Sequence, residues 1–199
     1  LINDRPLAED IINATKDGLK GHLPLSVKTR TGFSQVDMSW ISFLLDRKLQ
    51  ALTVHGRTRK EMSKVPANWD LIGSARRLRD QGGYDTMIIG NGDVRDHAHG
   101  LELAKRHKLD GIMIGRGVFH DPFAFAEQSP WADYPTEKRI ELYRKHVELF
   151  AKTWHGQERA IQTLNKFCKI YINGFDGAKE MREQLMQATS TDELLKALS

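Results

Sequence analysis

The stretch from Met87 to Gly117 constrains the fold of this chain more than any other part of the sequence. Two short apolar runs, at 87–89 and 112–114, are each followed by a loop rich in glycine. The residues between these loops, 95–108, have the length of a helix and carry several apolar side chains. Apolar runs of this length, bounded by turn residues, are typical of strands buried on both faces of a parallel sheet. The stretch therefore predicts a strand, a glycine-rich loop, a helix, a second strand and a second glycine-rich loop.

The two predicted loops have the composition of an anion-binding site. Their glycines would let the backbone turn sharply and present N–H groups to an anion. Arg116 lies between Gly115 and Gly117, where its guanidinium would contact a phosphate through two hydrogen bonds. The alternative is that these loops are only tight connections, but two such loops in succession favour a phosphate site. Asp93 is also expected to cap the helix that follows it.

Two similar units precede this stretch. A helix is predicted over 6–20, then a strand over 25–30 with a helix over 36–48, and a strand over 51–55 with a helix over 69–80 capped by Asn68. Four units of strand and helix in a row imply a parallel sheet covered by helices.

Four such units are half of an eight-stranded barrel, which needs about 250 residues. The expected fold is therefore α/β, the carboxyl-terminal half of a (β/α)8 TIM barrel, with the amino-terminal half of the barrel missing upstream of Leu1. The alternative is an open, doubly wound domain of four strands. Such a domain would carry its glycine-rich phosphate loop after its first strand, whereas the strand over 25–30 ends in Lys28, Thr29 and Arg30.

The pattern changes after residue 128, where strands stop and helices follow. Thr136 is expected to cap a helix whose apolar side chains recur with a period near 3.6. A second helix is predicted over 157–171, and two short helices close the chain, the last opened by a capping box of Ser190 and Glu193. The predicted domains are a partial barrel at 1–128 and an all-α helical domain at 129–199.

Composition excludes several classes of protein. The chain has 199 residues, of which 40% are hydrophobic and 28% charged, as in ordinary globular proteins. No apolar run approaches the roughly 18 residues that span a bilayer, and a start without Met or a signal peptide indicates a fragment or a trimmed product. The formal charge of +4 permits a nucleic-acid partner without requiring one. One cysteine, Cys168, excludes an internal disulfide and indicates a cytoplasmic protein. No Cys/His spacing typical of a metal site is present.

Polar side chains stand where the predicted strands end. Because catalytic groups in (β/α)8 barrels come from these ends, we expect one cationic site that suits a ligand with a phosphate and an electron-accepting ring. A lysine that ends an apolar strand is unusual unless it is paired, although Lys28 could simply extend to the rim. His55 could likewise be a structural histidine. The side chains at the strand ends are those of Lys28, Arg30, His55, Arg57, Asn91, Asp93 and Arg116.

Together these residues resemble the tRNA-dihydrouridine synthase family. The resemblance is closest over residues 1–128 and extends into the helical tail, especially at 164–171. It implies a barrel that holds FMN, a helical domain that helps to hold tRNA, and reduction of the uracil 5,6 double bond driven by NADPH. The matching motifs are Val27-Lys-Thr-Arg30, Thr53-Val-His-Gly-Arg-Thr-Arg59, Pro66-Ala-Asn-Trp69, Ile89-Gly-Asn-Gly-Asp-Val94 and Gly111-Ile-Met-Ile-Gly-Arg-Gly117.

The resemblance assigns roles position by position. Lys28 matches a lysine that contacts the flavin ring, and His55 a histidine near the flavin and its phosphate. Arg30 and Arg57 are expected to face the target nucleotide or its phosphates. The two phosphate-side loops correspond to Asn91, Gly92 and Asp93, and to Gly115 and Arg116.

One family feature has no counterpart in this sequence. The family's catalytic cysteine, which donates a proton to the uracil ring, sits on an upstream strand. We therefore expect it upstream of Leu1, and expect this chain alone to carry half of an active site and to be inactive. Cys168 falls on the apolar side of a predicted helix and is interpreted as a small core residue.

The predicted helix over 157–171 supplies the expected RNA contact. At about 100° per residue, Arg159, Lys166 and Lys169 fall on one arc of roughly 80°, so we expect them to contact tRNA. The alternative is a charged face that only meets solvent. For the chain as a whole, two other functions remain open. One is an FMN-dependent barrel oxidoreductase acting on a small molecule, which the helical tail disfavours, and the other is a non-catalytic RNA-binding fragment.

Overall fold

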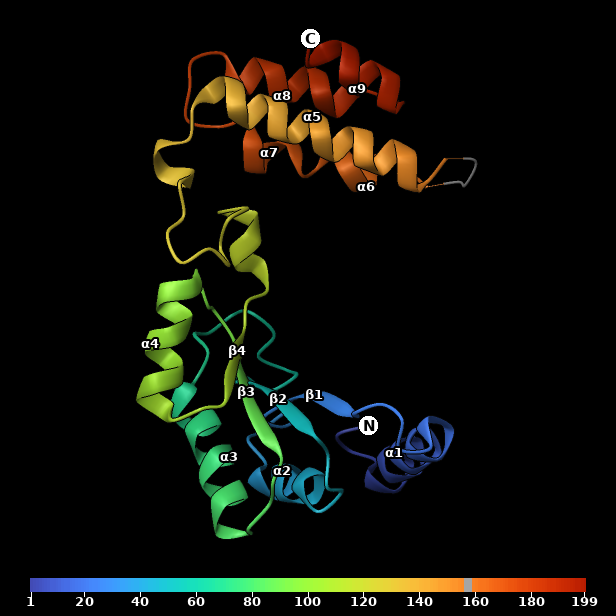
Figure 1. Cartoon of the computed structure of the whole chain (residues 1–199), viewed down its shortest axis with the longest axis vertical. Coiled ribbons are helices and arrows are strands. Elements are labelled where there is room, and N and C mark those ends of the chain that lie inside the picture. The colour runs from blue at the N-terminus through green and yellow to red at the C-terminus, as the bar shows by residue number, and fades with distance from the viewer. Residues whose placement is uncertain (156–158) are drawn as a thin grey trace. The chain divides into compact units, whose positions relative to one another are not determined.

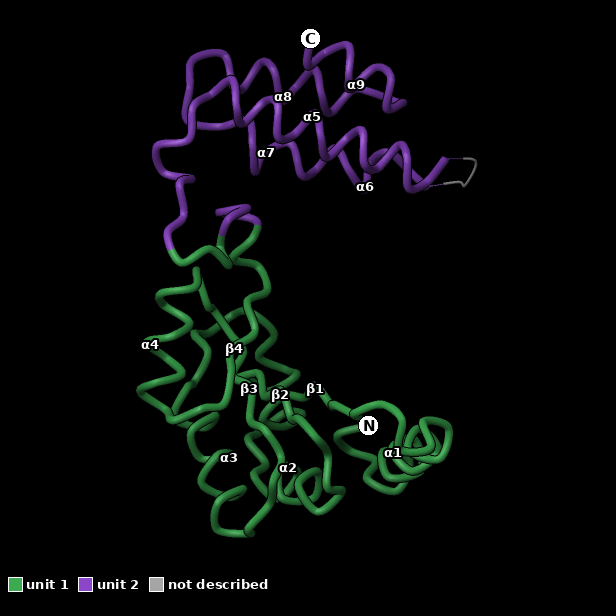
Figure 2. The backbone as a smooth tube through the Cα atoms, in the orientation of Figure 1, with its two compact units in different colours: residues 1–118, 124–127 green, residues 119–123, 128–199 purple. Residues whose placement is uncertain are grey.

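The computed structural model describes residues 1–155 and 159–199. The chain divides into two compact units, coloured green and purple in Figure 2. The first holds residues 1–118 and 124–127, and the second holds residues 119–123 and 128–199. Each unit has its own core of buried apolar side chains.

The first unit is built on a parallel sheet of four strands, as predicted (Figure 1). The strands follow the order of the sequence, so each pairs with the next strand along the chain. Their bounds are β1 Ser26–Arg30, β2 Ala51–His55, β3 Met87–Asn91 and β4 Gly111–Met113. The register pairs Arg30 with His55, His55 with Asn91, and Asn91 with Met113. The last residues of the four strands therefore lie in one row.

Helices alternate with the strands and pack against one face of the sheet. Leu52, Val54 and Ile88 are fully buried, and they share one core with apolar side chains of the first three helices. These strands and helices could be predicted from the sequence, because each apolar run is bounded by turn residues. The helices are α1 Arg5–Leu19, α2 Met38–Leu45, α3 Trp69–Gln81 and α4 His97–His107.

One of the two predicted caps in this unit is confirmed and the other is wrong. The side chain of Asn68 accepts a hydrogen bond from the N–H of Leu71 at 3.2 Å, as expected at the start of α3. Asp93 does not cap α4. That helix begins at His97, three residues later than a cap at Asp93 would allow, and its cap is Asp96, whose carboxylate accepts from the N–H of His99 at 2.8 Å. The carboxylate of Asp93 instead contacts the guanidinium groups of Arg57 and Arg116.

The regular elements of the second unit, within the described residues, are all helical. Tyr143, Val147, Leu164 and Leu185 are buried at the centre of this unit. None of the helices in the described part of the chain combines the length and the apolar character that a membrane span requires. The helices are η2 Trp131–Asp133, α5 Thr136–Thr153, α6 Gln162–Asn165, α7 Cys168–Tyr171, α8 Ala178–Gln187 and α9 Thr191–Ala197.

The prediction of one continuous helix over 157–171 is wrong. Its first two positions, Gln157 and Glu158, lie outside the described residues, and the rest contains two separate one-turn helices, α6 and α7, with non-helical residues before and between them. Between α6 and α7 the N–H of Phe167 bonds to the carbonyl of Leu164 at 2.9 Å, and that of Ile170 to the carbonyl of Phe167 at 3.0 Å. These bonds reach three residues back rather than four, so the α-helical pattern is interrupted at Lys166 and Phe167. The side chain of Asn165 is buried and donates a hydrogen bond to the carbonyl of Ala188 at 3.0 Å. Tertiary contacts of this kind override helix propensity.

The predicted caps in the second unit are also only partly confirmed. Thr136 begins α5 rather than capping it, because Pro135 takes the cap position and makes no side-chain hydrogen bond. At α9 the hydroxyl of Ser190 accepts from the N–H of Glu193 at 3.1 Å, as the capping box requires. The carboxylate of Glu193 reaches one residue further than expected and accepts from the N–H of Thr189 at 2.7 Å.

Candidate cofactor site at the strand ends

The sheet face opposite the helices carries polar side chains at its carboxyl end. Side chains alternate between the two faces along a strand, and Val54 packs into the core beneath the helices. His55 therefore lies on the other face, and the register places Arg30 and Asn91 beside it. Lys28 lies two residues before Arg30 and shares its face. The structure thus brings four of the predicted site residues together on one face.

The side chain of Arg57 is almost fully enclosed beside this row, with 3% of it exposed. Its Nε donates to the carbonyl of Val65 at 2.5 Å, and its Nη2 donates to Asp93 Oδ2 at 2.5 Å. Its Nη1 lies 3.2 Å from His55 Nε2. A buried guanidinium is tolerated when its donors meet acceptors, and here each of its three nitrogens does. Arg57 consequently joins the end of β2 to the loop that follows β3.

The contact with Arg57 defines the hydrogen-bonding state of His55. A guanidinium can only donate, so Nε2 of the imidazole accepts the hydrogen bond and the neutral ring carries its proton on Nδ1. Partial burial lowers the pKa of His55 to about 4, with further lowering by the charges of Arg30, Lys28 and Arg57. The ring is therefore neutral at pH 7 and has one N–H to donate.

Asp93 collects several donors at the loop after β3. Besides Arg57, its carboxylate accepts from the N–H of Ala67 at 2.9 Å and lies 3.3 Å from Nη2 of Arg116. Burial on its own would raise the pKa of Asp93, but the hydrogen bonds from Arg57 and Ala67 and the charge of Arg116 hold it below the ordinary value. Asp93 is thus ionised at neutral pH, and it links the loop after β3 with Arg116 at the start of η1 Arg116–Phe119.

Gly92 is required by the way this loop approaches β2. Its φ is +127°, which side chains rarely allow, and a Cβ there would stand 2.5 Å from the Ala67 Cβ and 2.9 Å from the His55 Cδ2. The carbonyl of Gly92 accepts from the indole of Trp69 at 3.1 Å. Sequence reasoning included Ala67 and Trp69 in a family motif but gave them no role. Their roles depend on backbone groups, which a residue pattern does not display.

The side chain of Asn91 is turned towards β4. Its amide donates to the carbonyl of Met113 at 2.8 Å, which ties together the ends of β3 and β4. The second glycine loop follows directly after β4. A Cβ at Gly115 would meet no heavy atom of the described residues within 4 Å, so that side of the loop is open. Both predicted loops therefore lie at the same end of the sheet.

Lys28 and Arg30 differ in how they are held. Partial loss of hydration lowers the pKa of Lys28, and the charge of Arg30 lowers it further. Arg30 donates through Nη1 to the carbonyl of Thr58 at 2.9 Å and to that of Met62 at 3.2 Å, which braces the loop after β2. Both line a hollow of about 600 Å³ beside β1, whose other walls include Val27.

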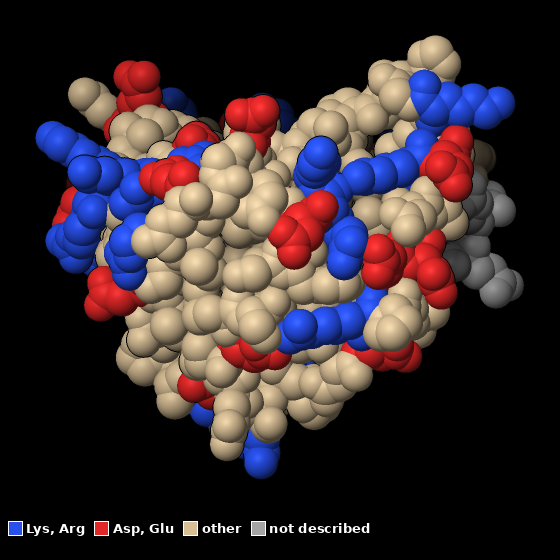
Figure 3. Space-filling model, turned by 90° about the horizontal axis from the view of Figure 1, so that it is seen from below, with Lys and Arg blue, Asp and Glu red and all other residues tan. Residues whose placement is uncertain are grey.

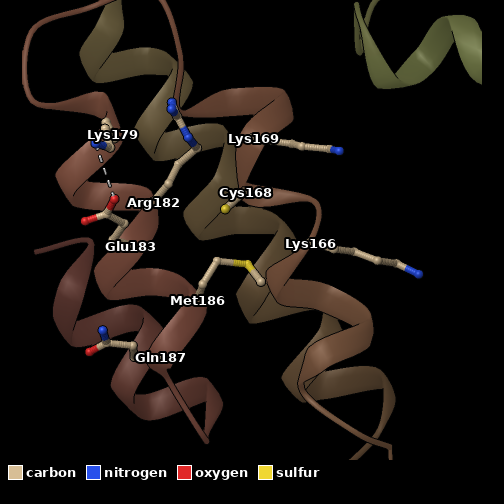
Figure 4. Close-up of a pocket in the computed structure, with 8 residues that line it drawn as sticks. All are labelled: Lys166, Cys168, Lys169, Lys179, Arg182, Glu183, Met186 and Gln187. Carbon is tan, nitrogen blue, oxygen red and sulfur yellow. Dashed lines mark ion pairs between the residues drawn. The ribbon is translucent and has the colours of Figure 1, made fainter.

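The cations predicted for RNA contact lie in the second unit. Lys166 directly follows α6 and Lys169 lies on α7. Both lysines are exposed and extend in the same direction in Figure 4. The guanidinium of Arg159 lies over the ring of Trp154, 4.5 Å from its centroid. The same view shows a hollow of about 630 Å³ lined by Lys166, Cys168, Lys169, Lys179, Arg182, Glu183, Met186 and Gln187.

Charge on the face seen in Figure 3 is mixed. The face seen in Figure 3 carries basic and acidic side chains side by side, without one continuous basic area. Cys168 is buried in the core of the second unit, as predicted, and burial raises the pKa of its thiol. Among the described residues, no group of three His, Cys, Asp or Glu side chains is placed to hold a metal ion. Local geometry at the strand ends, rather than net charge, is therefore the guide to function.

Comparison with known proteins identifies the family. The family model described as "Dihydrouridine synthase (Dus)" matches residues 1–199. The chain belongs to the dihydrouridine synthase family. It is 43% identical over 189 residues to the "Probable tRNA-dihydrouridine synthase" of Staphylococcus aureus (strain Mu50 / ATCC 700699), covering 94% of this chain and 56% of that protein. It is also 43% identical over 190 residues to the "Probable tRNA-dihydrouridine synthase 2" of Bacillus subtilis (strain 168), covering 94% of this chain and 57% of that protein.

Membership of the dihydrouridine synthase family confirms the resemblance inferred from the five sequence motifs. The parallel sheet and its helices also agree with the α/β fold expected for this family. The chain spans a little over half the length of the curated relatives that it matches.

Proposed function

We propose that this chain supplies FMN contacts in a tRNA-dihydrouridine synthase, which reduces uridine to 5,6-dihydrouridine in tRNA with NADPH as the reductant. The observation that carries the proposal is the row of cations with a neutral histidine at the ends of the strands, flanked by two glycine loops. A phosphate and an electron-accepting ring both favour such donors.

The residues present fit FMN in their chemistry. Arg116 is 61% exposed, and its carboxylate partner among the described residues, Asp93, is shared with Arg57, so Arg116 retains donors for a phosphate. The loop at Gly115 is open on the side where a Cβ would stand. His55 offers an N–H, and Lys28 an ammonium group of lowered pKa. Asn91, Gly92 and Asp93 would shape the first phosphate-side loop, and Gly115 with Arg116 the second.

Bound FMN would supply hydride transfer to the uracil ring. Lys28 would hold positive charge beside the ring and stabilise negative charge that develops there. His55 would donate its Nδ1 proton as a hydrogen bond rather than lose it, because a histidine with a pKa of about 4 is already neutral at pH 7. The proton that completes the reduction requires a general acid, and we assign it to a cysteine outside this sequence.

The substrate contacts divide between the two units. Arg30 is partly exposed and remains a proposed contact to the target nucleotide. The target base must leave its stack to be reduced, as other base-modifying enzymes require. Arg159, Lys166 and Lys169 of the helical unit are proposed to contact tRNA phosphates. We place this reaction in the cytoplasm. Residues 1–128 would then serve as the FMN-binding part and 129–199 as the tRNA-binding part.

A chimera tests the proposal directly. The amino-terminal half-barrel that we expect in the Bacillus subtilis relative would be fused to residues 1–199 of this chain. We expect the chimera to retain FMN and to form dihydrouridine in tRNA with NADPH, measured by mass spectrometry of tRNA nucleosides. The chain alone should form none. A folded chimera without flavin, or dihydrouridine formed by the chain alone, would contradict the proposal.

A further inference from the structure

Arg57 stands out because its charge is buried and its donors are distributed over three segments. Val65 belongs to the loop after β2, His55 to the end of β2 itself, and Asp93 to the loop after β3. Removing a charge from water is costly unless hydrogen bonds and an ion pair compensate. A side chain held in this way has one orientation, so it can fix the positions of the groups that it contacts.

We propose that Arg57 is a positioning residue, whose guanidinium fixes the imidazole of His55 with its proton on Nδ1 and holds the Gly92–Asp93 loop against that ring. The inference rests on the proposed function in one respect, since it takes FMN as the ligand that His55 serves. The placement of the ring itself stands on contacts within the chain.

Two contacts restrain the ring from the same side. Nε2 is held by Nη1 of Arg57 at 3.2 Å. The neighbouring Cδ2 lies 2.9 Å from the point where a Cβ of Gly92 would stand, so the loop backbone packs closely against that edge. If the ring were flipped, a C–H rather than an acceptor would face the guanidinium. If the proton were on Nε2, two N–H donors, those of Arg57 and His55, would face each other. The contact with Arg57 therefore selects the Nδ1-protonated ring, and the Gly92 backbone limits movement of the Cδ2 edge.

This role differs from the one expected from the sequence, which was contact with the target nucleotide. Each nitrogen of the guanidinium already has a partner within the chain. With 3% of its side chain exposed, Arg57 presents little surface to a nucleotide. A lysine at this position would keep the charge but could not address three acceptors in a fork.

Nitrogen NMR of the histidine side chains tests the positioning role in this chain without any ligand. The chain has eight histidines, and the signals of His55 are identified by their loss in His55→Asn. In the unaltered chain we expect the two ring nitrogens of His55 to give well-separated shifts, with the proton on Nδ1. A proton on Nε2 would overturn the proposal without the need for any further variant.

The second part of the NMR experiment uses the variant Arg57→Lys. We expect the two His55 nitrogen shifts to move towards each other as both tautomers become populated, while the remaining histidine signals stay in place. Arg59→Lys is the matched control, because Arg59 is exposed on the same loop and should leave His55 unchanged. An unchanged tautomer in a folded Arg57→Lys chain would overturn the proposal.

The flavin assignment is tested separately, by FMN titration of the chimera carrying Arg57→Lys. We expect its affinity for FMN to fall at least several-fold. A changed tautomer with unchanged affinity would keep Arg57 as the residue that positions His55 but would remove FMN as the reason for it. An unchanged tautomer with reduced affinity would contradict the positioning role and leave the proposed function standing.

Discussion

At the scale of single residues, the arginines of the site have two different roles: one holds the loops in place, and another is free to contact a ligand. Arg57 is enclosed and engaged at every nitrogen, whereas Arg116 is 61% exposed and makes one contact of 3.3 Å to Asp93. Both arginines follow a predicted strand, and the sequence assigned each of them to a ligand, Arg57 to the target nucleotide and Arg116 to the phosphate of FMN. Arg57 and Arg116 differ in side-chain exposure and in hydrogen-bond partners. Both differences depend on how the loops after β2 and β3 pack together, which the sequence does not show.

Arg116→Ala should weaken FMN retention by the chimera. If the guanidinium makes charge-assisted hydrogen bonds to the phosphate, the loss should be about 1.5–3 kcal/mol. Fluorescence titration with FMN measures it. Arg106→Ala is the matched control, because Arg106 is similarly exposed, at 63%, and has one carboxylate partner, Glu102. Equal affinities in the two variants would count against a phosphate site at Arg116.

At the scale of elements, the sequence predicted the sheet well and the helical tail less well. The strand over 51–55 was predicted to the residue, because an apolar run between Gln50 and Gly56 admits few alternatives. The helix expected over 157–171 is interrupted at Lys166 and Phe167, directly after Asn165, whose buried side chain bonds to Ala188, 23 positions away. The row of Arg30, His55 and Asn91 followed from the parallel register alone, but the partners of Arg57 did not.

The interrupted helix changes the basis of the RNA prediction without removing it. Lys166 and Lys169 no longer share a continuous helical arc, yet both are exposed and extend in the same direction (Figure 4). Replacing both by Glu should weaken tRNA binding and reduce the dependence of log K on log salt by about 1.4–1.8, since each phosphate contact contributes roughly 0.7–0.9. Folding should be little affected, because exposed substitutions usually change stability by about 0.5 kcal/mol or less.

The measurement is the affinity of the chimera for tRNA at several salt concentrations. Lys138→Glu with Lys145→Glu is the matched control, because both lysines are exposed on α5 and the change in net charge is the same. A salt slope reduced equally by both pairs would show that net charge, rather than this pair of lysines, governs binding.

At the scale of the whole chain, the sheet leaves surface that a closed barrel would cover. In the described sheet β1 and β4 each pair with one strand only. The hollow beside β1 has, besides its cationic side chains, several apolar ones, among them Ile11, and Leu7 on the same helix is 47% exposed. Exposed strand edges and apolar patches favour association between chains. The free edges of β1 and β4 can therefore still pair with other strands, either those of a closed barrel or those of another chain.

We expect the 199-residue chain to self-associate through the surface beside β1. Ile11→Lys should reduce this association, because it removes an apolar side chain from the hollow and adds a cation to those already there, at a position 46% exposed where lysine suits a helix. Leu101→Lys is the matched control, since Leu101 is 57% exposed on α4 and lies outside that hollow. Sedimentation velocity over a range of concentrations measures the effect. A chain that stays monomeric at every concentration would contradict the expectation, and an equal response to both variants would show that general surface hydrophobicity, rather than the open side of β1, drives the contact.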